Sequence, residues 1–272
     1  MRTATSPWSV DRGCPASCAA EPEPRVSLAE LARRYAALTY TLTRATARGG
    51  RIADPDTLRG EARAVLAALG TGLETGLPAR LGAPDGAGLG TLVVANHVSW
   101  LDVVALLAVE PVVVLAKREV GRWPVIGPLA RRAGTRFIDR DGSPRQLPHT
   151  VAGLADALRG GTSVLVFPQA TTWCSEAGGR FRRAPFQAAA DAGAPVRPVT
   201  VAYRQGGAPS KVAAFLGEEE FTVSLRRVAA AKDLTVRVTA HTPLRGTDRR
   251  ALAAAARDAV TRRVAGSVTA AA

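Results

Sequence analysis

The chain has 272 residues, of which 47% are hydrophobic and 22% are charged, so it can bury a substantial core. This composition excludes a chain that is disordered throughout, and no run approaches the ~18 apolar residues of a membrane-spanning helix. The net charge of +13, carried almost entirely by arginine, suits an anionic partner such as a phospholipid surface, an acidic carrier protein or nucleic acid. A GC-rich coding bias predicts the same arginine excess.

Residues 1–24 form a Pro-rich leader of low hydrophobicity, which predicts disorder. The leader lacks the apolar core of a secretory signal, so we do not expect export. Cys14, Cys18 and Cys174 are too few for a disulfide framework or a four-ligand zinc site, and the Cys-x-x-x-Cys spacing in the leader is interpreted as incidental. We therefore expect a reducing cytoplasmic environment and no bound metal.

Residues 25–80 are expected to hold two helices. Ser27 is a plausible N-cap for a helix over 26–48, in which leucines recur at helical spacing between arginines. The pattern fits a core helix and a helix lying at a membrane interface equally well. Helix-breaking residues cover 49–55, and a second helix is predicted over 56–73.

From residue 90 to 265, short apolar runs alternate with helix-compatible sequence. The runs cover 91–95, 112–116, 135–138, 163–167, 197–203 and 235–240, and a final helix is expected over 248–264. This alternation predicts an α/β domain with a mostly parallel central sheet flanked by helices. The ligand site of such a domain lies at the carboxyl ends of its strands.

The run 91–95 leads directly into His97 and, five positions later, Asp102, which together form a His-x4-Asp motif. Positions five apart on one helix point roughly 140° away from each other, so we expect His97 in a loop and Asp102 in the first helical turn. The carboxylate could then accept the Nδ1 proton and leave Nε2 free to take a proton from a hydroxyl. The alternative is a capping box from Ser99 to Asp102 with a structural role alone, and the two interpretations are compatible.

Three further blocks fall near strand ends: Lys117 and Arg118 with the segment 134–140 that ends in Arg140, the loop Pro168-Gln169-Ala170-Thr171, and the pair Pro195 and Pro198. In this order and spacing, together with the His-x4-Asp motif, residues 90 to about 205 resemble the glycerolipid acyltransferase family. That family includes the 1-acylglycerol-3-phosphate acyltransferases.

The resemblance implies a role for several side chains. His97 would be the general base for an acceptor hydroxyl that attacks an acyl thioester directly, and Asp102 would orient its ring. Arg140 would grip the phosphate of the acceptor, and Lys117 could add to that anion site. The structural alternative for Arg140 is an ion pair with a neighbouring aspartate.

The loop 168–172 departs from the family pattern, in which Glu-Gly stands where this chain has Gln169-Ala170. We expect Pro168, Gln169, Ala170 and Thr171 to contribute to substrate binding, with Thr171 and nearby N–H groups on a phosphate or oxyanion at the start of a helix. Ala170 is acceptable only if the backbone there avoids positive φ. Gln169 drops a charge, which makes this loop the expected place of acceptor choice.

Two segments are expected to contact lipid in other ways. The resemblance implies that Pro195 and Pro198 line an acyl or acceptor tunnel; the structural alternative is a rigid edge-strand entry. Trp173, Phe181 and Phe186 alternate with arginines and are interpreted as a basic, aromatic rim that faces phospholipid headgroups.

The expected function is an O-acyltransferase that moves a fatty acyl chain from acyl-CoA or acyl carrier protein to a lysophospholipid, above all 1-acylglycerol-3-phosphate. It needs no cofactor, works at the inner face of the cell membrane as a peripheral cytoplasmic protein, and binds no nucleic acid. The alternatives are a lyso-ornithine lipid as acceptor, or a catalytically reduced lipid-binding homologue.

Overall fold

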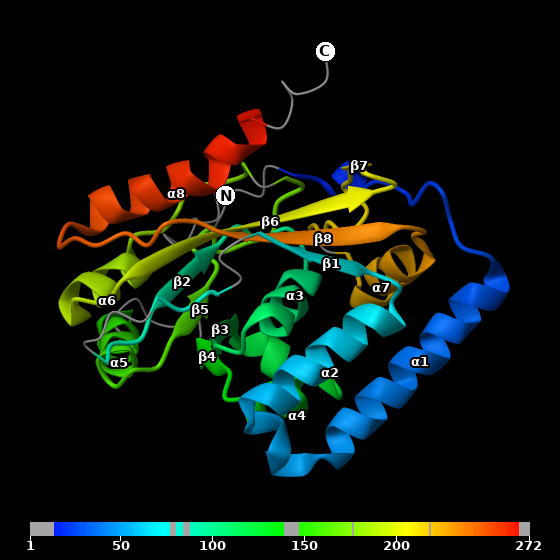
Figure 1. Cartoon of the computed structure of the whole chain (residues 1–272), viewed down its shortest axis with the longest axis horizontal. Helices are drawn as coiled ribbons and strands as arrows, with labels where there is room; N and C mark the ends of the chain where they lie inside the picture. The colour runs from blue at the N-terminus through cyan, green and yellow to red at the C-terminus, as the bar shows by residue number, and fades with distance from the viewer. Residues whose placement is uncertain are drawn as a thin grey trace, which may run out of the picture.

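A computed structural model describes residues 14–76, 80–83, 88–138, 147–175, 177–217 and 219–266 (Figure 1). Within them lies an eight-stranded sheet of order β1-β8-β6-β2-β5-β3-β4, with β7 beside β6. The strands are β1 Gly72–Thr75, β2 Leu92–Ala95, β3 Val113–Lys117, β4 Arg136–Ile138, β5 Val164–Val166, β6 Val196–Gln205, β7 Ala208–Pro209 and β8 Leu234–Ala240. The α-helices are α1 Leu28–Ala47, α2 Pro55–Ala68, α3 Leu101–Val109, α4 Ile126–Arg132, α5 Leu147–Arg159, α6 Ala184–Ala192, α7 Phe221–Ala230 and α8 Arg249–Gly266.

The sheet is mostly parallel, which confirms the predicted fold class. Strands β2, β3, β4 and β5 pair in parallel with one another, and β6 joins them in parallel through β2. Strands β7 and β8 pair antiparallel with β6, and β1 pairs in parallel with β8. Because β2 and β5 are parallel neighbours, the loops that follow them emerge side by side at one edge of the sheet.

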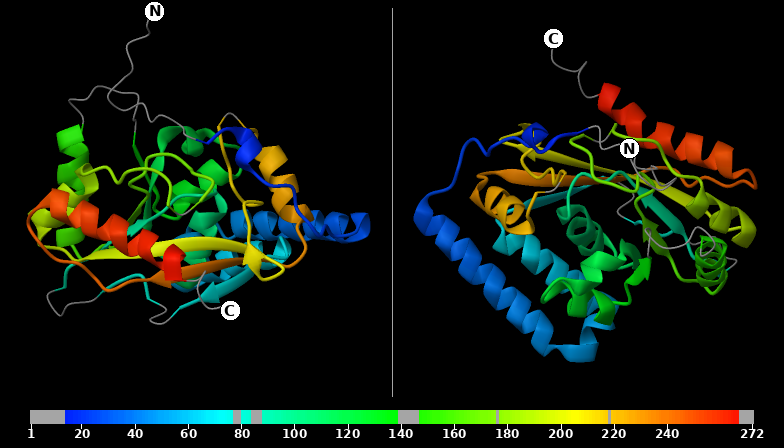
Figure 2. Two further views of the ribbon diagram at one scale, coloured as in Figure 1. Left: turned by 90° about the horizontal axis from the view of Figure 1, so that it is seen from above. Right: turned by 180° about the vertical axis from the view of Figure 1, so that it is seen from behind.

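Helices cover both faces of the sheet, as Figure 2 shows with α8 on one side and the α1–α2 pair on the other. Alternate residues of β2 divide between two cores: Val93 and Ala95 pack with α1, α2, α3 and α7, whereas Leu92 and Val94 pack with α5, α6 and α8. This alternation follows from the two-residue period of a strand, and it explains why the central strands are almost continuously apolar.

Helix α1 packs into the fold on one face. Its predicted cap is confirmed, because Ser27 accepts a hydrogen bond from the Glu30 N–H. Arg34 is 7% exposed and donates to the carbonyl oxygens of Leu69, Ala229 and Ala231 at 2.8–3.0 Å. This face of α1 is therefore that of a core helix, which was one of the two predicted alternatives. On the other face, Tyr40 is exposed.

The prediction of a helix through residue 73 is wrong at its end. Helix α2 stops at Ala68, Gly70 adopts φ +65°, and the chain enters β1, which pairs with β8. A Cβ on Gly70 would lie 2.2 Å from the Arg34 guanidinium, so the turn requires glycine for its conformation and for its space.

The leader has an ordered part, contrary to the disorder that its composition predicts. Residues 14–24 include a short 3₁₀ turn, Ala16–Cys18, and Cys14, Cys18 and Ala19 pack against the core on the α1 side. Residues 1–13 lie outside the described part of the chain. Among the described helices, none has the length and apolarity needed to cross a bilayer.

Candidate active site

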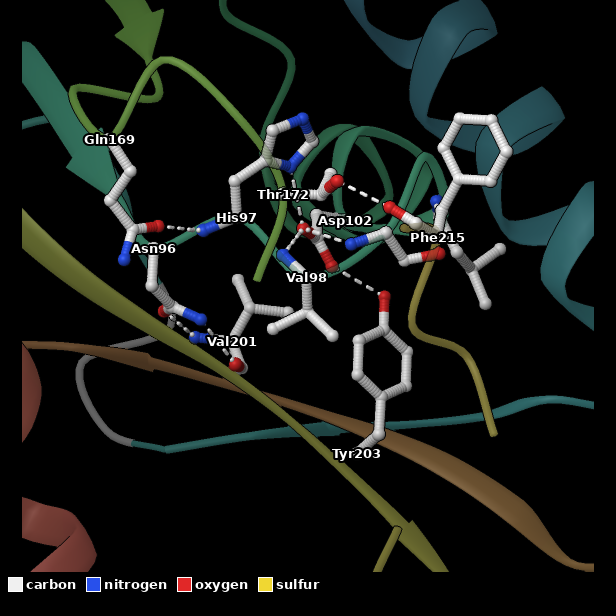
Figure 3. Close-up of polar contacts among 11 residues, drawn as sticks. Asn96, His97, Val98, Asp102, Gln169, Thr172, Val201, Tyr203 and Phe215 are labelled. Atoms are coloured by element: carbon white, nitrogen blue, oxygen red, sulfur yellow. Dashed lines mark hydrogen bonds and ion pairs between the residues drawn. The ribbon is translucent and has the colours of Figure 1, made fainter. Parts of the chain in front are cut away.

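The His-x4-Asp motif closes into a dyad at the carboxyl end of β2. His97 lies in the loop and Asp102 in the first turn of α3, as predicted, and Nδ1 of His97 lies 2.8 Å from Oδ2 of Asp102 (Figure 3). Because His97 lies outside the helix, the two side chains can meet, whereas on one regular helix they would point away from each other.

The Asp102 carboxylate is fully buried and accepts hydrogen bonds from four protein groups. Oδ2 accepts from His97 and from the N–H groups of Val98 and Ser99 at 2.7 and 2.9 Å, and Oδ1 accepts from the Tyr203 hydroxyl at 2.6 Å. The contact with Ser99 is the return half of a capping box, but the forward half differs from the prediction, because the Ser99 hydroxyl accepts from the Leu101 N–H and Trp100 is the N-cap residue of α3.

Tyr203 is a positioning residue that the sequence did not reveal. Strand β6 runs parallel to β2 and extends beyond its end, where Ala95 pairs with Val199. The same extension lets the backbone of Val201 exchange two hydrogen bonds with Asn96 and brings Tyr203 under Asp102. Burial, and after it the charge of Asp102, raises the pKa of Tyr203 well above its usual value, so the phenol stays protonated and donates.

The ring of His97 is fixed by its neighbours and remains partly exposed. It stacks on Phe167 with ring centroids 4.0 Å apart, and 21% of the side chain is accessible. Because a carboxylate only accepts hydrogen bonds, Nδ1 carries the proton and Nε2 presents a lone pair. Nε2 points away from Asp102 in Figure 3.

A largely apolar cavity of about 720 Å³ lies beside His97. Its wall is formed by side chains of α1, α2, α3, β3 and α4, and Phe167, Ala170, Thr171 and Thr172 contribute to it next to the histidine. Lys117, at the end of β3, also lines it. The volume is in the range of pockets that enclose small organic ligands.

The loop after β5 braces the main chain of His97. Gln169, only 2% exposed, accepts a hydrogen bond from the His97 N–H at 2.6 Å and donates its amide to the Gly178 carbonyl; the Trp173 N–H donates to the His97 carbonyl at 2.8 Å. We expected Pro168 and Gln169 to contact the substrate, but neither side chain lines the cavity. A carboxylate at position 169 could accept from the His97 N–H but would offer no donor to the Gly178 carbonyl, so the second contact depends on the amide.

Ala170 adopts a backbone conformation with positive φ, which we expected an alanine at this position to avoid. Its φ is +63°, in the left-handed region that disfavours any residue with a Cβ. Thr171 lines the cavity beside it, but the loop does not open a helix as predicted, because the described residues 171–175 and 177–183 contain turns and bends and α6 begins only at Ala184. The backbone therefore provides a turn here, and no helix N-terminus.

The remaining predicted positions divide into three groups. Arg140 lies outside the described residues, so its predicted phosphate contact stays a prediction. Pro195 and Pro198 are buried at the start of strand β6 and do not line the cavity, in contrast to the predicted tunnel. Because β6 lies in the centre of the sheet, the alternative of an edge strand is wrong as well. The aromatic rim is wrong for Phe181 and Phe186, which are 8% and 0% exposed and stack in the second core.

Comparison with known proteins places this site in a family. A family model described as Acyltransferase matches residues 82–202. The 1-acyl-sn-glycerol-3-phosphate acyltransferase of Neisseria meningitidis serogroup B is 39% identical over 176 residues, which cover 65% of this chain and 67% of that protein. The lyso-ornithine lipid O-acyltransferase of Pseudomonas aeruginosa is 37% identical over 169 residues, 61% of this chain and 65% of that protein.

A solved structure shares the fold. The crystal structure of the 1-acyl-sn-glycerophosphate (LPA) acyltransferase from Thermotoga maritima matches with a TM-score of 0.61 over 90% of this chain and 97% of that chain. At 18% identity, this likeness speaks for the fold alone.

Replacing Ala170 by glycine should stabilise the protein. The variant Ala170→Gly removes the Cβ from a residue at φ +63°, so we expect the free energy of unfolding to rise by about 1 kcal/mol in urea denaturation. The matched control is Ala254→Gly on the exposed face of α8, which should lower it by a similar amount. A loss of stability in Ala170→Gly would show that the positive φ of Ala170 does not strain the backbone.

Removing the hydroxyl of Tyr203 should destabilise the site. In Tyr203→Phe, Oδ1 of the buried Asp102 loses the hydroxyl that donates to it, so the free energy of unfolding should fall by about 2 kcal/mol. Tyr35→Phe, which removes the same atom from α1, serves as the control and should change stability by less than half as much. Equal effects of the two variants would show that Tyr203 does not support the carboxylate.

Proposed function

Because the chain belongs to the acyltransferase family, we propose that it transfers a fatty acyl chain from a thioester donor to the free hydroxyl of a lysophospholipid. The observation that carries this proposal is the dyad beside the cavity: Nδ1 of His97 is held 2.8 Å from Asp102, and His97 lines an apolar space. A base that faces an apolar cavity suits a reaction between a hydroxyl and a fatty acyl group.

The dyad accounts for both proton steps. Nε2 of His97 takes the proton from the acceptor hydroxyl while the hydroxyl oxygen attacks the thioester carbonyl carbon. The carbon–sulfur bond then breaks, the ester forms, and the departing sulfur takes the proton back from His97. Asp102 stabilises the imidazolium between these steps, and its own hydrogen bonds to Val98, Ser99 and Tyr203 keep it from moving.

The cavity is the proposed site of the acyl chain. Its wall contains mostly aliphatic and aromatic side chains, and its volume of about 720 Å³ exceeds that of a single headgroup. The donor is expected to be acyl-CoA or acyl carrier protein, both of which are anionic and suit a protein with a net charge of +13. None of these steps requires a metal or an organic cofactor.

Removal of the base tests the reaction. His97→Ala should lower acyl transfer by about a thousandfold in an assay with labelled acyl-CoA and acyl carrier protein donors, while the far-UV circular dichroism spectrum stays unchanged. His149→Ala, an exposed histidine on α5, is the matched control and should keep full activity. Retained turnover in His97→Ala would exclude His97 as the base, and an inactive parent protein with intact lysolipid binding would favour the lipid-binding alternative.

The acceptor is proposed to be 1-acylglycerol-3-phosphate, with a lyso-ornithine lipid as the second candidate because relatives of both kinds match the chain. Gln169 cannot distinguish them, since its side chain contacts protein groups at both ends. Lys117 lines the cavity and is a cation suited to a phosphate, and Arg140 is proposed to assist it.

Lys117 provides the discriminating variant. Lys117→Ala should lower kcat/KM about tenfold for an acceptor with a phosphate headgroup and much less for an ornithine headgroup, which has none. The measurement is turnover across a panel of lysolipids for the parent protein and the variant. Equal losses for both acceptors would remove Lys117 from headgroup recognition.

We further propose that the protein attaches peripherally to an anionic membrane at the inner face of the cell membrane. Val125 is 47% exposed and also lines the cavity, so an apolar residue lies where a lipid would enter. Val125→Asp should reduce sedimentation with anionic vesicles at least about twofold, because it places a charge at the interface. Val223→Asp on α7, with 52% exposure and no contact with the cavity, should bind as the parent does.

A further inference from the structure

All three cysteines of the chain meet at one place. Cys174 is 160 positions from Cys14 in the sequence, yet its Sγ atom and those of Cys14 and Cys18 lie within 4.8 Å of one another, with Cys14 and Cys174 at 3.1 Å. Cys18 closes the 3₁₀ turn Ala16–Cys18, and Cys174 follows the loop that braces His97. The spacing in the leader thus positions two sulfurs opposite a third.

The three sulfurs have the geometry of a metal site. A tetrahedral zinc ion with Zn–S bonds of about 2.3 Å holds its sulfurs about 3.8 Å apart. The Cys14–Cys174 separation of 3.1 Å is shorter than that value, and the other two are at most 4.8 Å, so side-chain shifts of under about 1 Å would place all three sulfurs around one ion. Each of the three side chains is half-buried, so water can reach the cluster and supply a fourth ligand.

The charge balance of the cluster involves its thiols and the nearby Lys211. Burial, and after it the neighbouring Cys14, raises the pKa of the Cys174 thiol to about 11, so an ion that binds at this sulfur displaces a proton. Lys211 acts on Cys174 in the opposite direction, and its carbonyl oxygen accepts a hydrogen bond from Ala20 of the same leader. A lysine beside three thiolates would offset the single negative charge that remains after a divalent ion binds.

We propose that Cys14, Cys18 and Cys174 bind one thiophilic metal ion, Zn²⁺ or an ion of similar softness, with water as the fourth ligand. Three S–H bonds break, three metal–sulfur bonds form, and three protons pass to solvent, without any change of oxidation state. This site replaces the expectation that the chain binds no metal, which counted only four-cysteine arrangements.

The proposed ion links the leader to the catalytic loop. Cys174 is the neighbour of Trp173, whose N–H donates to the His97 carbonyl at 2.8 Å. An ion on Cys174 would therefore fix the leader against the segment that sets the main-chain position of the base. It takes no part in acyl transfer itself, and its test does not depend on the identity of the acceptor.

The test is a titration of the full chain, purified with reductant and stripped of metal, with Zn²⁺ against a chromophoric chelator and with Co²⁺ by absorption spectroscopy. One equivalent should bind, and Co²⁺ should show sulfur-to-metal charge-transfer bands. Cys14→Ser, Cys18→Ser and Cys174→Ser should each weaken binding roughly a hundredfold. Ser17→Ala and Ser175→Ala, which flank the ligands, are the matched controls and should bind as the parent does.

Thermal unfolding provides a second readout for variants that fold poorly. Zn²⁺ should raise the Tm of the parent chain and of both serine controls, and should not raise that of the cysteine variants. Failure to bind one equivalent, or equal affinity in the cysteine variants, would overturn the proposal. A Cys14–Cys174 disulfide in the isolated protein, seen as the loss of two hydrogens that a thiol reductant restores, would overturn it as well.

Discussion

A fully buried carboxylate is the constraint around which this site is built. Removing one charge from water costs several kcal/mol unless hydrogen-bond donors replace the solvent, and Asp102 has four donors from two parts of the chain, the loop 97–99 and strand β6. Two are backbone N–H groups of the loop that begins α3, one is the imidazole, and one is a phenol on β6. The loop conformation, the tautomer of His97 and the extra length of β6 all follow from satisfying the same two oxygen atoms.

The side chain and the main chain of His97 are held from different directions. Asp102 and Phe167 fix the ring, whereas Gln169 and Trp173 fix the N–H and the carbonyl. The second pair comes from a loop that contains Ala170 in a left-handed conformation, and such strain persists only where the surroundings determine the backbone. The loop after β5 therefore contributes as much to the position of His97 as the loop after β2 does.

The features that could be predicted from the sequence are those encoded in adjacent residues. The cap at Ser27, the alternation of strands with helices and the placement of His97 and Asp102 all depend on local spacing. The features that were missed depend on long-range contacts: Tyr203 meets Asp102 from 101 positions away, and Cys14 meets Cys174 from 160. Strand β1 was missed for the same reason, since it exists only through its pairing with β8. Residue type indicated that Gln169 matters, but not which way its side chain points.

The guanidinium of Arg34 has a consequence for how the chain could be shortened. It joins the carbonyl ends of α2 and α7 to α1, and Gly70 keeps the space open for it. A truncated form that began after residue 34 would leave three buried carbonyl oxygens without this donor and an empty channel beside the turn into β1. A shortened form therefore has to keep Arg34 and the part of α1 that carries it, and a minimal enzyme or a domain graft designed from the motif-bearing region alone would start from an incomplete core.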